Sequence, residues 1–165
     1  HPAIRHESDK LSDAKLLKLI GANEPDTEGI FFPDTYFFTK NSSDLTILKR
    51  AYHAMQRHLE TEWLARQKSL PLKNSYEGLI LASIIEKETG RDSERTRVAG
   101  VFINRLRHSM KLQTDPTVIY GMGDKFDGNL RKIDLQTDHA YNTLLPEEME
   151  PLTFHLRSKN ITVLS

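Results

Sequence analysis

Cysteine is absent from this chain of 165 residues. Its absence excludes a disulfide framework and any zinc site built on thiolates. The chain also has no excess of either charge, because 23 basic residues balance 23 acidic ones. A general nucleic-acid binder usually carries a basic excess or a basic stripe, so this balance argues against one. With 38% hydrophobic residues, the chain can still build the core of one ordinary domain.

Long apolar segments are also lacking. The longest apolar run, Leu79 to Ile85, is far shorter than the roughly 20 residues that span a bilayer. No signal-peptide pattern is recognisable ahead of that run. The first residue is His1 rather than methionine, so we expect a fragment or a processed form of a longer protein.

Three familiar kinds of site are missing as well. The seven histidines include no HExxH pair, and His53 and His58 are five residues apart, which places them on different faces of a helix. No GxSxG elbow of a serine hydrolase occurs. Gly121-Met122-Gly123 is too short for a dinucleotide-binding loop. We therefore expect no metal and no cofactor.

The apolar spacing predicts a mainly α fold with minor β content, in the α+β class. Ser12 or Asp13 can start a first helix, and Pro71 closes the region after the second. Asp115 and Pro116 look like an N-cap followed by a proline at the first helical position, and Gly121 looks like a stop. The predicted helices cover residues 10–20, 45–68, 76–89, 94–107 and 115–120.

The remaining segments are predicted to be irregular or extended. Residues 28–38, EGIFFPDTYFF, are rich in aromatic side chains around a Pro-Asp pair, which indicates extended chain on both sides of a turn. Residues 121–134 hold three of the eight glycines and several aspartates, so we expect a loop there. A final strand is predicted over residues 161–164.

Two glutamates end the most hydrophobic stretch, LILASIIEKETGRD, and the helical phase separates them. At about 100° per residue, Glu88 falls about 20° from Leu81, whereas Glu86 falls about 140° away on the opposite side. We therefore expect Glu86 to be solvated and Glu88 to follow the buried stripe. Burial disfavours the charged form of a carboxyl group, and a neutral acid is what a departing glycosidic oxygen needs.

An ion pair is the plainer interpretation of a carboxylate on such a face. Five arginines that follow in sequence could each pair with Glu88: Arg91, Arg95, Arg97, Arg105 and Arg107.

Polar and aromatic residues after the later helices could hold a sugar. They lie in LQTDPTVIYG and AYNT, and their side chains can bind sugar hydroxyls and N-acetyl groups or pack on sugar faces. Each has a structural alternative, with Asp115 as a helix cap and Tyr120 and Tyr141 as core aromatics. The candidate substrate-binding residues are Gln113, Thr114, Asp115, Tyr120, Tyr141 and Asn142.

The motifs EGIFFPDTYFF, LASIIEKET, VFINRLRHSMKLQTDPTVIYGMG and AYNT resemble the endolytic murein transglycosylases of bacteria, the MltG or YceG-like family. The resemblance runs from about Glu28 to Thr143. It implies a fold similar to the lysozyme-like lytic transglycosylases, in which a glutamate-serine pair ends a helix. Glu88 and Thr89 would take that place, and Glu88 would be the catalytic acid and base.

The same resemblance implies a reaction. The MurNAc–GlcNAc β-1,4 bond of peptidoglycan would be cleaved without water, leaving a 1,6-anhydroMurNAc end and limiting glycan strand length. Glu88 would protonate the leaving oxygen and then accept the proton of the C6 hydroxyl as that oxygen attacks C1. The sugar supplies its own nucleophile, so no second carboxylate is needed, unlike in ordinary glycosidases.

The tail departs from the family pattern. After Thr143 the chain reads LLPEEMEPLTFHLRSKNITVLS, without the family's usual closing motifs. The predicted organisation is a trailing part of a LysM-like segment over 1–27, a YceG-like catalytic domain over 28–143 and a divergent tail over 144–165. An alternative function is a non-catalytic peptidoglycan-binding or scaffolding module that lost activity with this region.

Location and partners follow only from the resemblance. It implies an intact protein anchored in the bacterial inner membrane, with this domain on the periplasmic side. Peptidoglycan strands are the expected substrate, with cell-wall synthases as possible protein partners.

Overall fold

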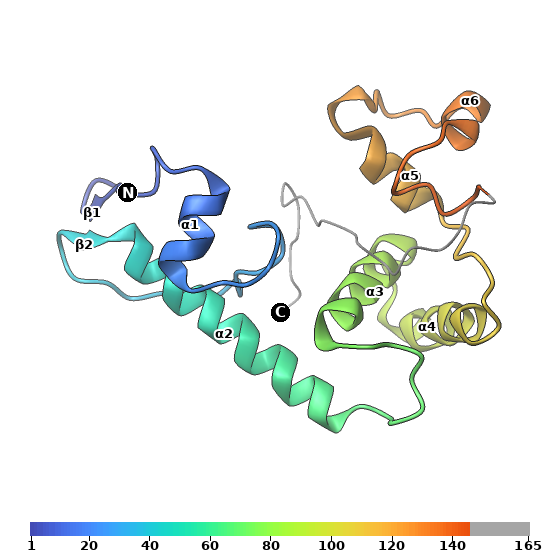
Figure 1. The fold of residues 1–165 in the computed structure, drawn as a ribbon, viewed down its shortest axis with the longest axis horizontal. Helices are drawn as coiled ribbons and strands as arrows, with labels where there is room; N and C mark the ends of the chain where they lie inside the picture. Colours follow the sequence, from blue (N-terminus) through green and yellow to red (C-terminus); the bar gives the residue numbers. More distant parts are fainter. Residues whose placement is uncertain (146–165) are drawn as a thin grey trace. The chain divides into compact units, whose positions relative to one another are not determined.

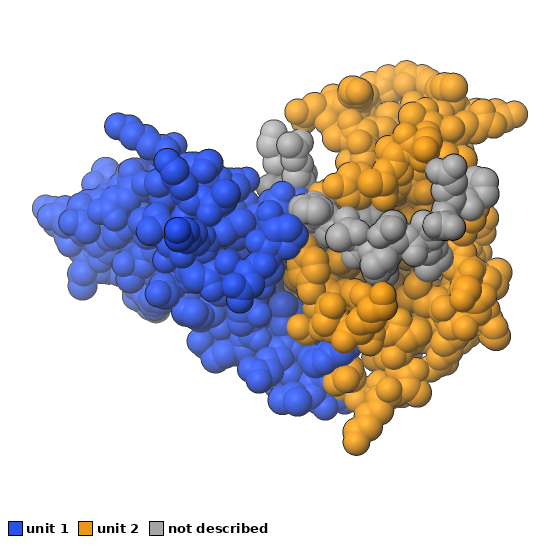
Figure 2. Space-filling model, viewed as in Figure 1, with its two compact units in different colours: residues 1–65, 155–165 blue, residues 66–154 orange. Residues whose placement is uncertain are grey.

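The computed structural model describes residues 1–145 as a mainly helical chain with one small two-stranded sheet (Figure 1). This confirms the predicted fold class. The described residues divide into two compact units, an N-terminal unit of residues 1–65 and a C-terminal unit that starts at Arg66 (Figure 2). The predicted division at residues 27 and 143 stays a prediction. No helix among residues 1–145 is long and apolar enough to cross a membrane.

Four elements build the N-terminal unit: β1 (Ile4–Arg5), α1 (Asp13–Ile20), β2 (Ser42–Ser43) and α2 (Asp44–Ala65). The two short strands pair in parallel, with Ile4 opposite Ser42. Helix α1 ends at Gly21, which has a φ of 78° and donates its N–H to carbonyls of the last turn. A residue without a Cβ adopts this left-handed conformation at little cost, which fixes the end of the helix there.

The core of the N-terminal unit forms where α1 meets α2. Leu17 and Ile20 of α1 pack with Ile30 and with Tyr52 of α2. The Tyr52 hydroxyl donates a hydrogen bond to Glu24 at 3.0 Å. Burial, together with this carboxylate, raises the pKa of Tyr52 to about 12. The tyrosine therefore stays neutral and anchors the loop after α1 to the long helix.

Residues 28–38 form neither helix nor strand, and they follow α2 through individual contacts. The Phe32 N–H donates to the Ala51 carbonyl at 3.1 Å, and the Phe32 ring stacks on His58 with centroids 4.1 Å apart. Farther along, Arg50 donates to the Phe37 carbonyl at 2.7 Å. The predicted turn-flanking segment is thus held against a helix rather than in a sheet.

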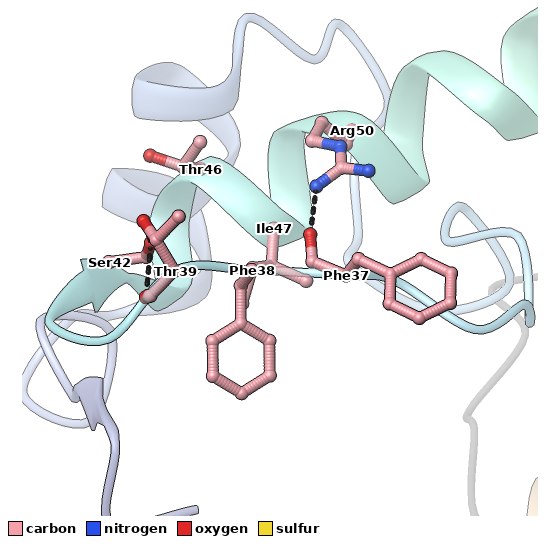
Figure 3. A pocket seen from close by; sticks show the side chains of 7 residues that line it. All are labelled: Phe37, Phe38, Thr39, Ser42, Thr46, Ile47 and Arg50. Atoms are coloured by element: carbon pink, nitrogen blue, oxygen red, sulfur yellow. Dashed lines mark hydrogen bonds between the residues drawn. The ribbon is translucent and has the colours of Figure 1, made fainter.

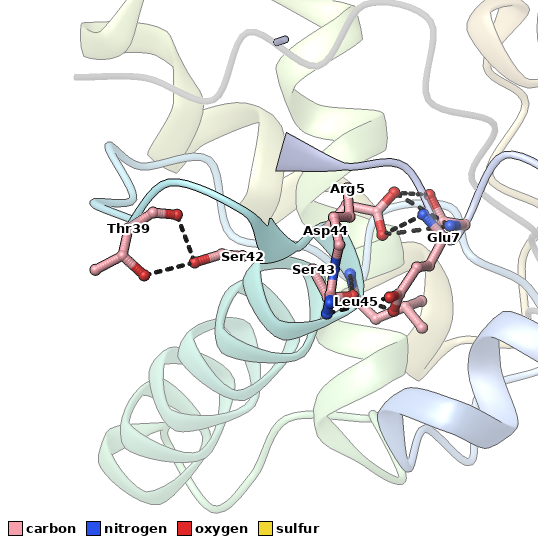
Figure 4. A network of polar contacts seen from close by, with 8 residues as sticks. Arg5, Glu7, Thr39, Ser42, Ser43, Asp44 and Leu45 are labelled. Atoms are coloured by element: carbon pink, nitrogen blue, oxygen red, sulfur yellow. Dashed lines mark hydrogen bonds and ion pairs between the residues drawn. The ribbon is translucent and has the colours of Figure 1, made fainter. Parts of the chain in front are cut away.

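Asp44 connects the start of α2 to the N-terminal segment (Figure 4). Its carboxylate accepts the backbone N–H groups of Glu7 and Ser8 at 3.1 Å each and the Ser8 hydroxyl at 2.6 Å. Burial alone would raise the pKa of Asp44, but these hydrogen bonds outweigh it and hold the pKa below its ordinary value. The ionised carboxylate therefore stabilises this junction.

The C-terminal unit begins with two helices that are connected by a short turn, α3 (Ser75–Glu88) and α4 (Asp92–Arg107). Their apolar sides enclose a core of Ile80, Leu81, Ile84, Phe102 and Leu112. Asn74 caps α3 by accepting the Glu77 N–H at 2.9 Å. Three short elements follow: α5 (Asp115–Met122), the 3₁₀ helix η1 (Gly123–Lys125) and α6 (Lys132–Gln136).

Two predictions for this unit were wrong in detail. The N-cap position of α5 is Thr114 rather than Asp115, and the helix continues through Gly121 and ends at Met122. Threonine and aspartate both suit a cap, and proline is accepted in either of the first two helical positions, so the sequence left this boundary one residue uncertain. The predicted loop over 121–134 contains η1 and the start of α6. The predicted strand over 161–164 lies outside the described residues.

Replacing Asp44 by asparagine should lower the free energy of unfolding by about 1–2 kcal/mol at pH 7, because charge-assisted hydrogen bonds are lost. The folded-state pKa of Asp44 is depressed, so its contribution is present above the ordinary aspartate value of about 3.9 and is lost as the pH falls below it. Urea denaturation at pH 7 and pH 3 measures the difference. Asp9→Asn, at a side chain that is 67% exposed, should change stability little at either pH.

Candidate functional site

Glu88 is the last residue of α3, and its position only partly matches the prediction. It continues the spacing of the buried residues Ile80, Leu81 and Ile84, as the helical phase requires. Its side chain is nevertheless exposed, so the predicted burial was wrong. The buried stripe reaches the end of the packed core at Ile84, and a residue one turn farther on lies beyond it. Glu88 is therefore aligned with the core but accessible to a substrate.

Glu86 does not stand free in solvent, which corrects the second part of that prediction. Arg95 of α4 approaches its carboxylate at 2.8 Å, and the Glu86 side chain is 37% exposed. Arg95 also contacts Asp92 at 2.9 Å. The arginine pair foreseen for Glu88 thus belongs to Glu86. Within residues 1–145, Glu88 forms no ion pair.

A single hydroxyl holds the Glu88 carboxylate. Thr114 donates from Oγ1 to Glu88 Oε2 at 2.8 Å, and Thr114 itself is only 2% exposed. A carboxylate is an acceptor only, so the hydroxyl hydrogen must point to Glu88. The other carboxylate oxygen, Oε1, accepts no hydrogen bond from the described part of the chain.

Two more threonines surround Thr114. The Thr114 N–H donates to Thr143 Oγ1 at 3.1 Å, and its carbonyl accepts the Thr117 hydroxyl at 2.8 Å. The hydroxyls of Thr117 and Thr143 are 2.9 Å apart. We call these three residues the threonine cluster. It joins the LQTDPT motif to the AYNT motif and satisfies the polar groups of a buried residue.

The loop before Thr114 is fixed by Arg105 of α4. One guanidinium nitrogen donates to the carbonyls of Lys111 and Leu112 at 2.9 and 3.1 Å and to Gln113 Oε1 at 2.8 Å. Gln113 has a φ of 54°, a left-handed conformation that is uncommon without glycine. This strained residue directly precedes the hydroxyl that binds Glu88, and strain of this kind clusters at functional sites.

The other predicted sugar-binding residues have different surroundings. Gln113 and Asp115 are exposed on either side of Thr114. The rings of Tyr120 and Tyr141 meet edge to face with centroids 4.9 Å apart, and Tyr141 packs against the core. Both rings thus take part in packing, and sugar binding by Tyr120 and Tyr141 stays a prediction.

The side chain of Asn142 forms hydrogen bonds with backbone groups. Its amide donates to the carbonyls of Leu135 and Thr137 at 3.0 and 2.8 Å, and its oxygen accepts the Leu144 N–H at 2.9 Å. These contacts tie α6 to the AYNT segment. Asn142 therefore positions Thr143, the next residue, and its predicted role at a sugar stays a prediction.

Thr89 follows Glu88 but does not bind it. Its hydroxyl donates to Glu94 at 2.9 Å and accepts the Arg91 N–H at 3.1 Å. The residue is 8% exposed and caps the end of α3. The glutamate-threonine pair does end a helix, as the resemblance implied, yet the hydroxyl on the carboxylate comes from Thr114.

The N-terminal unit contains a separate hollow of about 350 Å³ beside α2 (Figure 3). None of the predicted site residues lines it. Residues on and before the first turns of α2 surround it: Phe37, Phe38, Thr39, Ser42, Thr46, Ile47 and Arg50.

One group of possible metal ligands occurs within residues 1–145, formed by His6, Asp9 and Asp44. The Asp44 carboxylate already accepts hydrogen bonds from Glu7 and Ser8, and His6 and Asp9 are exposed. We assign no metal to this group.

Sequence reasoning missed the residues that support Glu88. Thr117 and Thr143 were not among the candidates, although Thr143 belongs to AYNT, and Arg105 was considered only as a direct ion-pair partner of Glu88. The available signal was the repetition of threonine in LQTDPT and AYNT, since buried hydroxyls need partners and often find one another.

Comparison with known proteins places this geometry in context. A family model described as the YceG-like family matches residues 3–151. A protein of Bacillus subtilis named endolytic murein transglycosylase is 36% identical over 152 residues, which is 81% of this chain and 41% of that protein. A protein of the same name from Streptococcus pneumoniae is 31% identical over 70% of this chain and 21% of its own length.

The fold also matches a crystal structure of a yceG-like protein from Listeria monocytogenes. The TM-score is 0.60 at 31% identity, and the match covers 79% of this chain and 45% of that one. The chain thus spans less than half the length of each of these relatives.

Adding a methyl group at Gly121 of α5 tests how tightly His139, the residue just before AYNT, packs on this helix. The Cβ of Gly121→Ala would collide with the His139 imidazole, so we expect a loss of about 1–3 kcal/mol. Gly100→Ala in α4 is the matched control, because nothing lies within 4 Å of its Cβ. It should gain about 0.5–1 kcal/mol from helix propensity.

The double variant Gly121→Ala/His139→Ala tests the cause. Removing the ring should recover most of the loss, and denaturant unfolding gives the coupling between the two sites. Additive effects would show that the clash is relieved in another way.

Proposed function

Because the chain belongs to the YceG-like family, we propose that it is an endolytic lytic transglycosylase that cleaves the glycan strands of peptidoglycan. The observation that carries the proposal is Glu88, an exposed carboxyl group at a helix end with a buried hydroxyl on one of its oxygens. The names of the Bacillus and Streptococcus relatives support murein as the substrate.

The proposed reaction uses one carboxyl group twice. Glu88 gives its proton to the oxygen of the MurNAc–GlcNAc β-1,4 bond as that bond breaks. The resulting carboxylate then takes the proton of the C6 hydroxyl of the same MurNAc, whose oxygen closes on C1 to form the 1,6-anhydro ring. The donated proton stays on the leaving sugar, Glu88 regains a proton from the C6 hydroxyl, and no water is consumed.

The surroundings of Glu88 fit a one-carboxylate mechanism. The neighbouring acid, Glu86, is held by Arg95 at 2.8 Å, so it is engaged in structure rather than available as a second acid. An exposed carboxyl group can be covered by a sugar ring, and the removal of water favours the neutral acid needed for the first step. Gln113 and Asp115, exposed beside Thr114, are the residues best placed for polar contacts to that sugar.

The place of action follows from the same proposal. Peptidoglycan lies outside the cytoplasm, so we propose that this domain works on the periplasmic side of the inner membrane, carried by an anchored longer protein. Limiting glycan strand length would couple it to cell-wall synthases.

Digestion of purified peptidoglycan tests the proposal. The chain should release muropeptides that end in 1,6-anhydroMurNAc, detected by mass spectrometry. Glu88→Gln keeps the shape but cannot donate or accept the proton, so we expect the rate to fall at least about 10²–10⁴-fold, the usual worth of a general acid-base group.

Glu86→Gln is the matched control in the same helix turn. It removes the Arg95 ion pair at a partly exposed site and should cost about 1 kcal/mol of stability or less, with the activity kept. Anhydro products that persist in Glu88→Gln would contradict the mechanism. Binding to peptidoglycan without any product from the parent chain would favour a non-catalytic module.

A further inference from the structure

Thr114 occupies an unusual position for a helix cap. It is the N-cap of α5, with extended φ and ψ angles of −122° and 123°, yet its side chain makes no capping hydrogen bond. An N-cap threonine normally accepts a backbone N–H of the first turn, which is worth about 1 kcal/mol. Here that stabilisation is forgone, because the hydroxyl is directed to Glu88 Oε2 at 2.8 Å.

The rest of Thr114 is immobilised by its neighbours. Its N–H is bound by Thr143 and its carbonyl by Thr117, while Arg105 fixes the preceding loop through Gln113. With 2% exposure, the residue has no surface to offer a sugar. A rigid, buried donor that faces one oxygen of an exposed acid is suited to orient that acid.

We propose that Thr114 is a positioning residue that makes the two oxygens of Glu88 unequal, leaving Oε1 to exchange the proton with the sugar. This rests on the proposed function of Glu88. A neutral acid carries its proton on one oxygen and keeps an acceptor on the other. Thr114 can therefore donate to Oε2 before and after the proton moves, so the carboxyl group keeps its orientation through both half-reactions.

The main test compares Thr114→Val with the parent chain on purified peptidoglycan. Valine keeps the size and the β-branch but removes the hydroxyl. We expect the maximal rate of anhydro-muropeptide release to fall about 10- to 100-fold, the usual cost of losing a hydrogen-bonding group that orients a functional ligand. The substrate concentration at half-maximal rate should change less than threefold, since Thr114 does not touch the sugar.

The conservative variant separates orientation from mere structural damage. Thr114→Ser retains a hydroxyl and should restore the rate to within about fivefold of the parent chain. Thr137→Val is the control, because its hydroxyl binds only the Ile133 carbonyl on the exposed side of α6.

Each outcome decides the question. A parent-like rate in Thr114→Val would overturn the proposal, as would a larger rate loss on removal of the Thr89 hydroxyl. If Thr114→Val does not fold, Thr114→Ser against Thr114→Ala decides in its place, and equal rates in these two would overturn it. A parent chain that releases no anhydro product, or that is unaffected by Glu88→Gln, would instead contradict the proposed function.

Discussion

The hydrogen bond from Thr114 to Glu88 joins the end of α3 to the start of α5 across 26 residues of sequence. It can form only if α4 returns the chain along α3 and the loop after α4 turns at the correct point. The shared core of α3, α4 and Leu112 fixes the first condition. Arg105, bound to the carbonyls of Lys111 and Leu112, fixes the second. The candidate site is thus a consequence of how two helices and one loop are joined.

The threonine cluster supplies hydrogen-bond partners for backbone groups that are buried at this junction. A chain that turns from a loop into a helix inside the protein brings unpaired backbone groups with it, and each buried one costs about 1–3 kcal/mol. Thr117 and Thr143 pair with the carbonyl and N–H of Thr114. The Thr114 hydroxyl is not needed for capping, because Pro116 has no N–H and the Thr117 N–H donates to the Thr114 carbonyl at 3.3 Å. The hydroxyl is therefore available for Glu88.

Local features of the sequence predicted much of this arrangement. The apolar spacing located α1, α2, α3 and α4 within a few residues, since each helix carries its own stripe. The helical phase distinguished Glu88 from Glu86. In the structure Glu88 continues the spacing of the buried residues of α3, whereas Glu86 pairs with Arg95. Burial could not be read in the same way, because the wheel shows where a side chain points and not how far the neighbouring core extends. The contact between Thr114 and Glu88 could not be predicted from local spacing, because the two residues are 26 positions apart in the sequence.

A proton-transferring acid must be held in a fixed orientation and must also be accessible to its substrate. The position of Glu88 at a helix end meets both requirements. In the middle of the buried stripe the carboxyl group would be ordered but closed to a polymer. On the opposite face it would be open, and Glu86 shows that such a carboxylate is readily taken by an arginine. One turn beyond the core, Glu88 keeps the direction of the stripe, stays exposed, and needs only one fixed donor to be ordered. A hydroxyl suits this position better than a guanidinium, because a cation would hold the carboxylate in its charged form and hinder the donation that starts the reaction.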